Sequence, residues 1–97
     1  MERKKTVRLR DMLHLYWQEH PELFQKRMEA RIKRLWGELC GSTIEQYTTK
    51  VFVRNRTLYV TMSSSVARNE MSSIRKQIVT ALNKKAGVDV IDDVVIR

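Results

Sequence analysis

The spacing of apolar residues changes twice along this 97-residue chain, and both changes restrict what it can fold into. Apolar residues recur every three or four positions up to about residue 39, every two positions from 48 to 63, and every three or four again from 65 to 86. The first and third spacings are typical of amphipathic helices, whereas the second is typical of half-buried strands. The chain is therefore predicted to be a mixed α+β protein.

Two helices are predicted before the first strand. The first covers residues 6–18, with Thr6 as a candidate N-cap. Its apolar stripe consists of Leu9, Met12, Leu13, Tyr16 and Trp17. Pro21 then starts a second helix, because the residue before a proline is pushed out of the α region while proline itself suits a first helical turn. This second helix is predicted to run to about Leu39, with Gly41 as its stop or bend.

A β-hairpin is predicted from residues 48–54 and 57–63, since both segments alternate and are rich in β-branched and aromatic residues. Asn55 and Arg56 form the connection between them. An Asn at the first position favours a two-residue turn, although a type I′ turn prefers Gly at the second position. The hairpin is expected, and its turn type stays open at this point.

One long helix from Ser65 to Ala86 is predicted to follow the hairpin, with Gly87 ending it. Residues 88–96 are predicted to form a closing strand. The expected order is thus α-α-β-β-α-β, a three-stranded sheet packed against helices. The whole chain, 1–97, is expected to be one domain, with residues 1–8 as a candidate flexible basic N-terminus.

The chain is basic along its whole length. Lys and Arg total 19 against 11 acidic residues, giving a formal net charge of +8 and a pI near 10.1. Ten basic and six acidic residues fall within 1–40, and nine and five fall within 41–97, so each part contributes +4. A basic tail on a neutral body is excluded. This charge favours a polyanionic partner, although a positive surface that serves only solubility is the alternative.

Residues that could carry catalysis or hold a metal are scarce. His14, His20 and Cys40 show no paired ligand spacing, and the sequence has no nucleophile-elbow serine or glycine-rich phosphate loop. Asp92 and Asp93 are adjacent in the last predicted strand, so they point to opposite faces and are expected to be solvated. We expect no enzyme activity, cofactor, metal or small-molecule substrate. With no membrane-spanning stretch, secretory signal or internal disulfide, a cytoplasmic protein is expected.

The candidate nucleic-acid contacts are basic residues that lie off the apolar stripes. On the hairpin they are Lys50, Arg54 and Arg56, since cations on flexible tips commonly contact phosphates. On the last predicted helix they are Arg68, Arg75, Lys76, Lys84 and Lys85. Simple solvation is the alternative for the hairpin cations, and the helix dipole would also favour the last two lysines. No aromatic display on a sheet face is evident, so phosphate contact is predicted instead of base readout.

Several short segments follow one another in a recognisable order. They are Leu35-Trp36-Gly37-Glu38-Leu39-Cys40-Gly41, Arg56-Thr57-Leu58-Tyr59-Val60-Thr61-Met62, Ser65-Val66-Ala67, Glu70-Met71 and Leu82-Asn83. They match a pattern with a W-x(4)-G segment, an L-x-V strand, a helix beginning S-x-A and continuing to a Leu-Asn pair, and a final strand. Over roughly residues 9–97 the chain resembles the bacterial domain family typified by DciA, the helicase-associated protein.

The resemblance implies a KH-like domain that binds DNA and, in DciA, also the replicative helicase DnaB, whose loading it assists. The chain lacks the G-x-x-G loop of a true KH module and the basic tail of longer relatives, so weak binding or binding beside a partner is expected. The predicted function is a non-enzymatic accessory domain that contacts phosphates of DNA, in preference to RNA, without reading sequence. The alternative is an adaptor that meets an acidic protein surface without touching nucleic acid.

Overall fold

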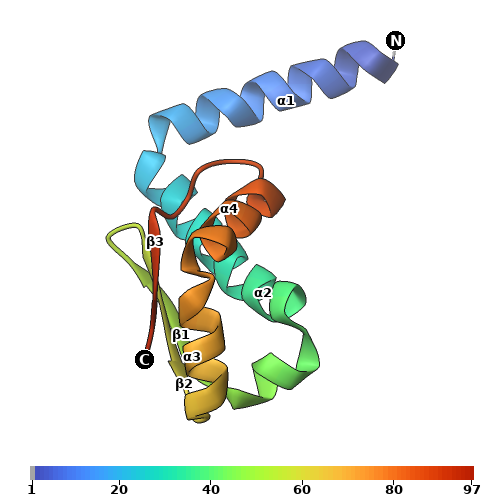
Figure 1. Ribbon diagram of the computed structural model, residues 1–97. Coiled ribbons are helices and arrows are strands. Elements are labelled where there is room, and N and C mark those ends of the chain that lie inside the picture. The colour runs from blue at the N-terminus through green and yellow to red at the C-terminus, as the bar shows by residue number, and fades with distance from the viewer. Residues whose placement is uncertain (1) are drawn as a thin grey trace.

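A computed structural model describes the backbone of residues 2–97 and the side chains of Leu9 and residues 11–97. The elements are α1 (Glu2–Glu19), α2 (Pro21–Tyr47), β1 (Thr48–Arg54), β2 (Thr57–Met62), α3 (Ser65–Ser73), α4 (Arg75–Ala86) and β3 (Asp93–Ile96) (Figure 1). The described part of the chain thus holds four helices and one three-stranded sheet. The predicted α+β class is confirmed.

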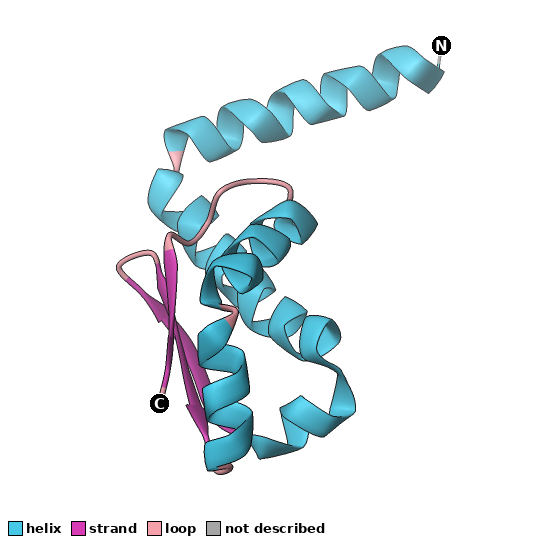
Figure 2. Cartoon of the chain, in the orientation of Figure 1, coloured by secondary structure: helices cyan, strands magenta, loops and turns pink. Residues whose placement is uncertain are grey.

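The sheet has the strand order β1-β2-β3. Strands β1 and β2 pair antiparallel, with Val53 opposite Leu58, whereas β2 and β3 pair parallel, with Tyr59 opposite Val95. The parallel pair requires a crossover, which α3 and α4 supply. Figure 2 shows helices α2, α3 and α4 on one face of the sheet. Among the described elements, none lies on the other face.

The predicted hairpin is confirmed almost to the residue. Its turn residues, Asn55 and Arg56, have φ values of 49° and 59°. Type I′ turns require positive φ at both central residues, and their twist matches that of the flanking strands. Arg56 therefore adopts a left-handed backbone conformation at a position that usually favours Gly.

The single long helix predicted for residues 65–86 is wrong, because the chain breaks at Ile74 into α3 and α4. Ile74 has φ −118° and ψ 28°, outside the helical region, and its side chain is 40% exposed instead of buried. Just before the break, the Ser73 hydroxyl donates a 2.6 Å hydrogen bond to the Glu70 carbonyl. Serine side chains that compete for backbone carbonyls weaken helices in this way. The observed order is therefore α-α-β-β-α-α-β.

The bend predicted at Gly41 is confirmed within α2. Gly41 has φ 78° and ψ 173°, a region that is essentially restricted to glycine. Six further helical residues, 42–47, follow the bend before the chain enters β1, so α2 ends at Tyr47 and not at about Leu39 as predicted. This path brings Thr48 back to Trp36, whose Nε1 donates a 3.2 Å hydrogen bond to the Thr48 hydroxyl. The W-x(4)-G segment thus combines a core tryptophan with the bend that returns the chain to it.

The hydrophobic core lies between the helices and the inner face of the sheet. Its largest fully buried residues are Ile32, Trp36, Leu58, Val60, Leu82, Val90, Ile91 and Val94. Val90 and Ile91 belong to the loop before β3, so the closing strand is shorter than predicted and starts at Asp93. Burial of apolar residues holds this loop in place without strand pairing.

Helix α1 projects away from the rest of the molecule (Figure 1). It starts at Glu2, so the candidate N-cap Thr6 lies inside it. Its base is fixed by Trp17, whose ring lies 5.6 Å from that of Phe24 and 5.9 Å from the Arg27 guanidinium carbon. The side chains of residues 1–8, where a flexible basic segment is predicted, lie outside the described part.

Most of the apolar stripe predicted for the first helix is exposed. Leu9 and Met12 are each 62% exposed, and Leu13 and Tyr16 are 51% and 45% exposed. Only Trp17 of that stripe is partly buried. The helical periodicity was correct, but the stripe contacts no other element along most of its described length. It is an apolar surface that another molecule could cover.

Candidate nucleic-acid interface

The uncovered face of the sheet collects cations and aromatic rings. Because neighbouring residues in a strand point to opposite faces, Leu58, Val60 and Met62 face the core while Tyr59 faces outward. We use the term outer sheet face for the surface formed by Lys50, Phe52, Arg54, Tyr59 and Arg97. Lys50, Arg54 and Arg97 are exposed. The same face also carries Val95 and the exposed carboxylate of Asp93 on β3. It thus combines a net positive charge with flat apolar groups.

Phe52 and Tyr59 are direct cross-strand partners on the outer sheet face. Their ring centroids lie 4.9 Å apart with an interplanar angle of 10°, so the rings are stacked. The Arg97 guanidinium carbon lies 5.0 Å from the Tyr59 centroid, and the Lys50 Nζ lies 5.1 Å from the Phe52 centroid. The distances fall within the range of cation–π contacts.

The sheet thus displays an aromatic pair that was not evident from the sequence. The aromatic pair could have been predicted from the alternation of apolar residues along each strand. Phe52 lies between Val51 and Val53, and Tyr59 lies between Leu58 and Val60, so each aromatic residue faces away from the apolar side of its strand. Only the register, however, shows that the two rings stack on each other.

Of the three predicted hairpin cations, Lys50 and Arg54 lie on the outer sheet face, but Arg56 does not. The Arg56 guanidinium forms a bidentate pair with Asp92, with both N···O distances 3.0 Å, and donates a further 3.1 Å hydrogen bond to the Asp89 carbonyl. Hydrogen bonding to Asp92 raises the pKa of Arg56, and the same bond lowers the pKa of Asp92. Arg56 thus fastens the hairpin turn to the loop before β3, and Asp92 is paired as well as solvated.

The other predicted cations lie on the helical side of the molecule. Arg68 lies on α3, is partly buried and donates a 3.1 Å hydrogen bond to the Met62 carbonyl. Its Nε is buried and has no hydrogen-bond partner among the described residues. The exposed cations of α4 form a separate group, which we call the helix-side cations: Arg75, Lys76, Lys84 and Lys85. The structure therefore divides the predicted contacts between two surfaces, with Arg56 and Arg68 bonded internally.

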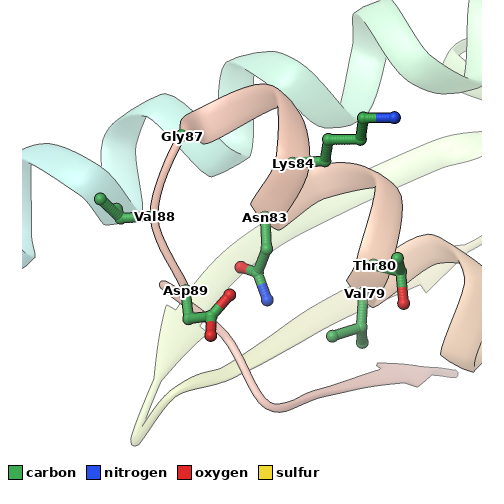
Figure 3. Close-up of a pocket in the computed structure, with 7 residues that line it drawn as sticks. All are labelled: Val79, Thr80, Asn83, Lys84, Gly87, Val88 and Asp89. Atoms are coloured by element: carbon green, nitrogen blue, oxygen red, sulfur yellow. The ribbon is translucent and has the colours of Figure 1, made fainter.

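A hollow of about 420 Å³ lies beside the C-terminal end of α4, and Asn83 in its wall is engaged in structural hydrogen bonds (Figure 3). The Asn83 amide reaches from α4 to the loop before β3, where its nitrogen donates to the Ile91 carbonyl at 2.8 Å. Its oxygen accepts from the amides of Val90 and Ile91 at 2.9 and 3.1 Å. The Lys84 side chain points away from the hollow. Asn83, from the Leu-Asn pair, serves to anchor this loop.

Replacing Asn83 with alanine is expected to destabilise the domain by about 2–4 kcal/mol, because three backbone groups of a buried loop lose their partner and each loss costs roughly 1–3 kcal/mol before relaxation. Urea unfolding followed by circular dichroism measures the change. Asn83→Asp keeps the acceptor for the Val90 and Ile91 amides but places a carboxylate oxygen against the Ile91 carbonyl, so a loss of stability is expected for this variant as well. A midpoint equal to that of the wild type for Asn83→Ala would contradict the anchoring role.

Cys40 is a half-buried free thiol on α2. Burial, with a smaller contribution from the Glu45 carboxylate, raises its pKa to about 11. Because the thiolate is the reactive form, labelling by a disulfide reagent at pH 8 should be on the order of 10²-fold slower than for an ordinary thiol of pKa near 8.5. The rate should rise about tenfold per pH unit up to about pH 11. The chain unfolded in guanidinium is the control and should react at the ordinary rate.

The fold and the outer sheet face define a class of small α+β domains that present an open, basic and aromatic sheet face. A family model described as "Dna[CI] antecedent, DciA" matches residues 8–96, nearly the whole chain. The chain belongs to the DciA family, as its motifs indicated. This is a family of helicase-associated accessory domains linked to DNA replication and helicase loading.

No curated protein and no solved structure matches the chain. The KH-like arrangement therefore stays a prediction from the sequence resemblance. Along the part of the chain that is described, none of the helices is both long enough and apolar enough to cross a membrane.

Proposed function

We propose that this protein is a non-enzymatic accessory domain that binds DNA in the cytoplasm and assists the loading or operation of the replicative helicase. Membership of the DciA family supports the link to replication. The observation that carries the proposed DNA contact is the outer sheet face, where Lys50, Arg54 and Arg97 are exposed on a side that no described helix covers. Phosphates are the ligands that such a row of cations favours.

The placement of Lys50 and Arg54 suits a nucleic-acid strand that runs along β1. Lys50 and Arg54 are four residues apart on β1, about 13 Å along the strand. That length corresponds to several phosphates of one nucleic-acid strand. Arg97 adds a third charge two strands away, where its backbone extends the β3 ladder through hydrogen bonds to Val60 and Met62. Such cations would contact the phosphate backbone of the nucleic acid and would not distinguish one base sequence from another.

The salt dependence of binding tests the proposal directly. Affinity for a 20-nucleotide single strand and for a 20-base-pair duplex would be measured by fluorescence anisotropy between 20 and 300 mM salt. Three phosphate contacts predict a plot of log affinity against log salt with a slope of about −2 for the single strand and about −3 for the duplex. Absence of binding at the lowest salt would overturn the proposed DNA contact.

A protein adaptor is the second candidate, and the exposed stripe of α1 favours it. Leu9, Met12 and Leu13 are more than half exposed, although helices normally bury such a stripe. In this reading the basic surface meets acidic residues of a partner and does not touch nucleic acid. Binding to the purified replicative helicase after nuclease treatment, by a protein that fails to bind either oligonucleotide, would favour the adaptor.

A further inference from the structure

We infer that Phe52, Tyr59 and Arg97 form a stacking subsite for an unpaired nucleobase. This inference rests on the proposed DNA contact and specifies its substrate, because only unpaired bases offer a free face to a protein ring. The outer sheet face then has two parts. Lys50 and Arg54 hold phosphates and the aromatic pair holds a base, while Arg97 contributes its charge to the phosphate contacts and its guanidinium plane to the base subsite.

The geometry of the ring pair decides where a base can go. The Phe52 and Tyr59 centroids are 4.9 Å apart, whereas a base inserted between them would require about 6.8 Å, twice the base-stacking distance of about 3.4 Å. The pair is therefore closed to intercalation and acts as one double-thickness platform. A base can stack only on an outer face of the pair. The Arg97 guanidinium carbon lies 5.0 Å from the Tyr59 centroid and 6.0 Å from the Phe52 centroid, so it lies beside both rings.

The Arg97 side chain can move while its backbone stays fixed in the sheet. Its amide donates to the Val60 carbonyl and its carbonyl accepts from the Met62 amide, both at 2.8 Å, so the backbone is fixed. Its side chain is exposed and forms no salt bridge with the described residues. A guanidinium plane stacks on a base as it does on an aromatic ring. The guanidinium, which lies beside both rings, can therefore swing onto a base that stacks on the pair.

A purely structural explanation of the ring pair is that cross-strand aromatic contacts stabilise the sheet. That explanation accounts for the stacking of Phe52 on Tyr59. It does not account for their place on the one face that lacks a helical cover, or for the two exposed cations beside them. The two explanations differ in one measurable respect, because only a subsite discriminates between strands that have bases and strands that lack them.

The test compares oligothymidylate of 20 nucleotides with a 20-mer of abasic sites that carries the same phosphates. The wild-type protein is expected to bind the thymidylate strand at least about tenfold more tightly, since stacking of one base on an aromatic side chain is worth about that factor. The double variant Phe52→Leu/Tyr59→Leu should reduce the ratio to about one and leave the salt slope unchanged. Thermal unfolding shows whether this variant retains the fold.

Two single variants make the test independent of the folding of the double variant. Arg97→Lys keeps the charge and removes the plane, so the ratio should fall about threefold at an unchanged salt slope. Tyr47→Leu removes an exposed aromatic ring outside the outer sheet face and should change neither quantity. Quenching of a 2-aminopurine base placed in the strand reports stacking directly, and Arg97→Lys should weaken it.

The outcomes separate this inference from the proposed function. Equal affinity of the wild-type protein for thymidylate and abasic strands, with a steep salt slope, would overturn the stacking subsite and leave the phosphate contacts standing. Absence of binding to both strands would overturn the DNA contact itself. A ratio that stays high in Phe52→Leu/Tyr59→Leu would place base recognition on another surface and also overturn the subsite.

Discussion

Replacing Lys50, Arg54 and Arg97 together with glutamine is expected to weaken binding to a single-stranded 20-mer about 100-fold at 0.1 M salt. Each lost contact lowers the magnitude of the salt slope by about 0.7, and three contacts over the decade between 1 M and 0.1 M salt give a factor of roughly 10². The slope itself should become about two units less steep. Fluorescence anisotropy titrations at four or more salt concentrations measure both quantities.

The matched control is Lys76→Gln/Lys84→Gln/Lys85→Gln, which removes an equal number of positive charges from the helix-side cations. If the outer sheet face is the interface, this control should weaken binding only a few-fold, through the loss of net charge. Equal losses in the two triple variants would mean that binding follows net charge alone. A larger loss in the control would move the interface to α4. Either result contradicts the proposed outer sheet face.

Replacing Trp36 with alanine should be the most damaging single substitution for stability. Trp36 is 1% exposed, and removal of a buried tryptophan costs about 3–5 kcal/mol. That loss is a large part of the 5–15 kcal/mol that typically stabilises a domain, and it corresponds to a fall in melting temperature of the order of 20 °C for a chain of this size. Thermal unfolding followed by far-ultraviolet circular dichroism measures it.

Two controls separate the core role of Trp36 from the general presence of a large ring. Trp36→Phe keeps most of the apolar volume but loses the hydrogen bond to Thr48, so a loss of about 1–2 kcal/mol is expected. Trp17→Ala removes a partly exposed ring at the base of α1 and should cost less than Trp36→Ala. A melting temperature of Trp36→Ala within a few degrees of the wild type would show that the core tolerates the cavity.

The sequence predicted most elements because their periodicity reflects local burial. The hairpin followed from the alternation around Val51 and Val60. The bend followed from the presence of a glycine at position 41, because glycine adopts backbone conformations that other residues avoid. The break at Ile74 did not follow, because Ile74 continues the helical spacing and the Ser73 hydrogen bond to the Glu70 carbonyl beside the break leaves no mark in that spacing. Periodicity reports which face is apolar and does not report a short interruption.

The candidate interface was predicted only in part, because it depends on pairings between distant residues. Lys50 and Arg54 could be placed at the hairpin from the sequence. The engagement of Arg56 by Asp92 depends on a contact across 36 positions, and the stacking of Phe52 on Tyr59 depends on strand register. Arg97 joins them through the parallel pairing of β3 with β2, which no local pattern encodes.

The projection of α1 gives the domain a reach that its size would not suggest. The radius of gyration is 16.1 Å, against about 12.5 Å for a compact chain of 97 residues, and the long axis measures 54 Å. An 18-residue helix accounts for about 27 Å of length. A partner protein bound to the apolar stripe of α1 would leave the outer sheet face accessible. If both surfaces bind as proposed, we expect the domain to act as a spacer that contacts a partner through α1 and DNA through the sheet at the same time.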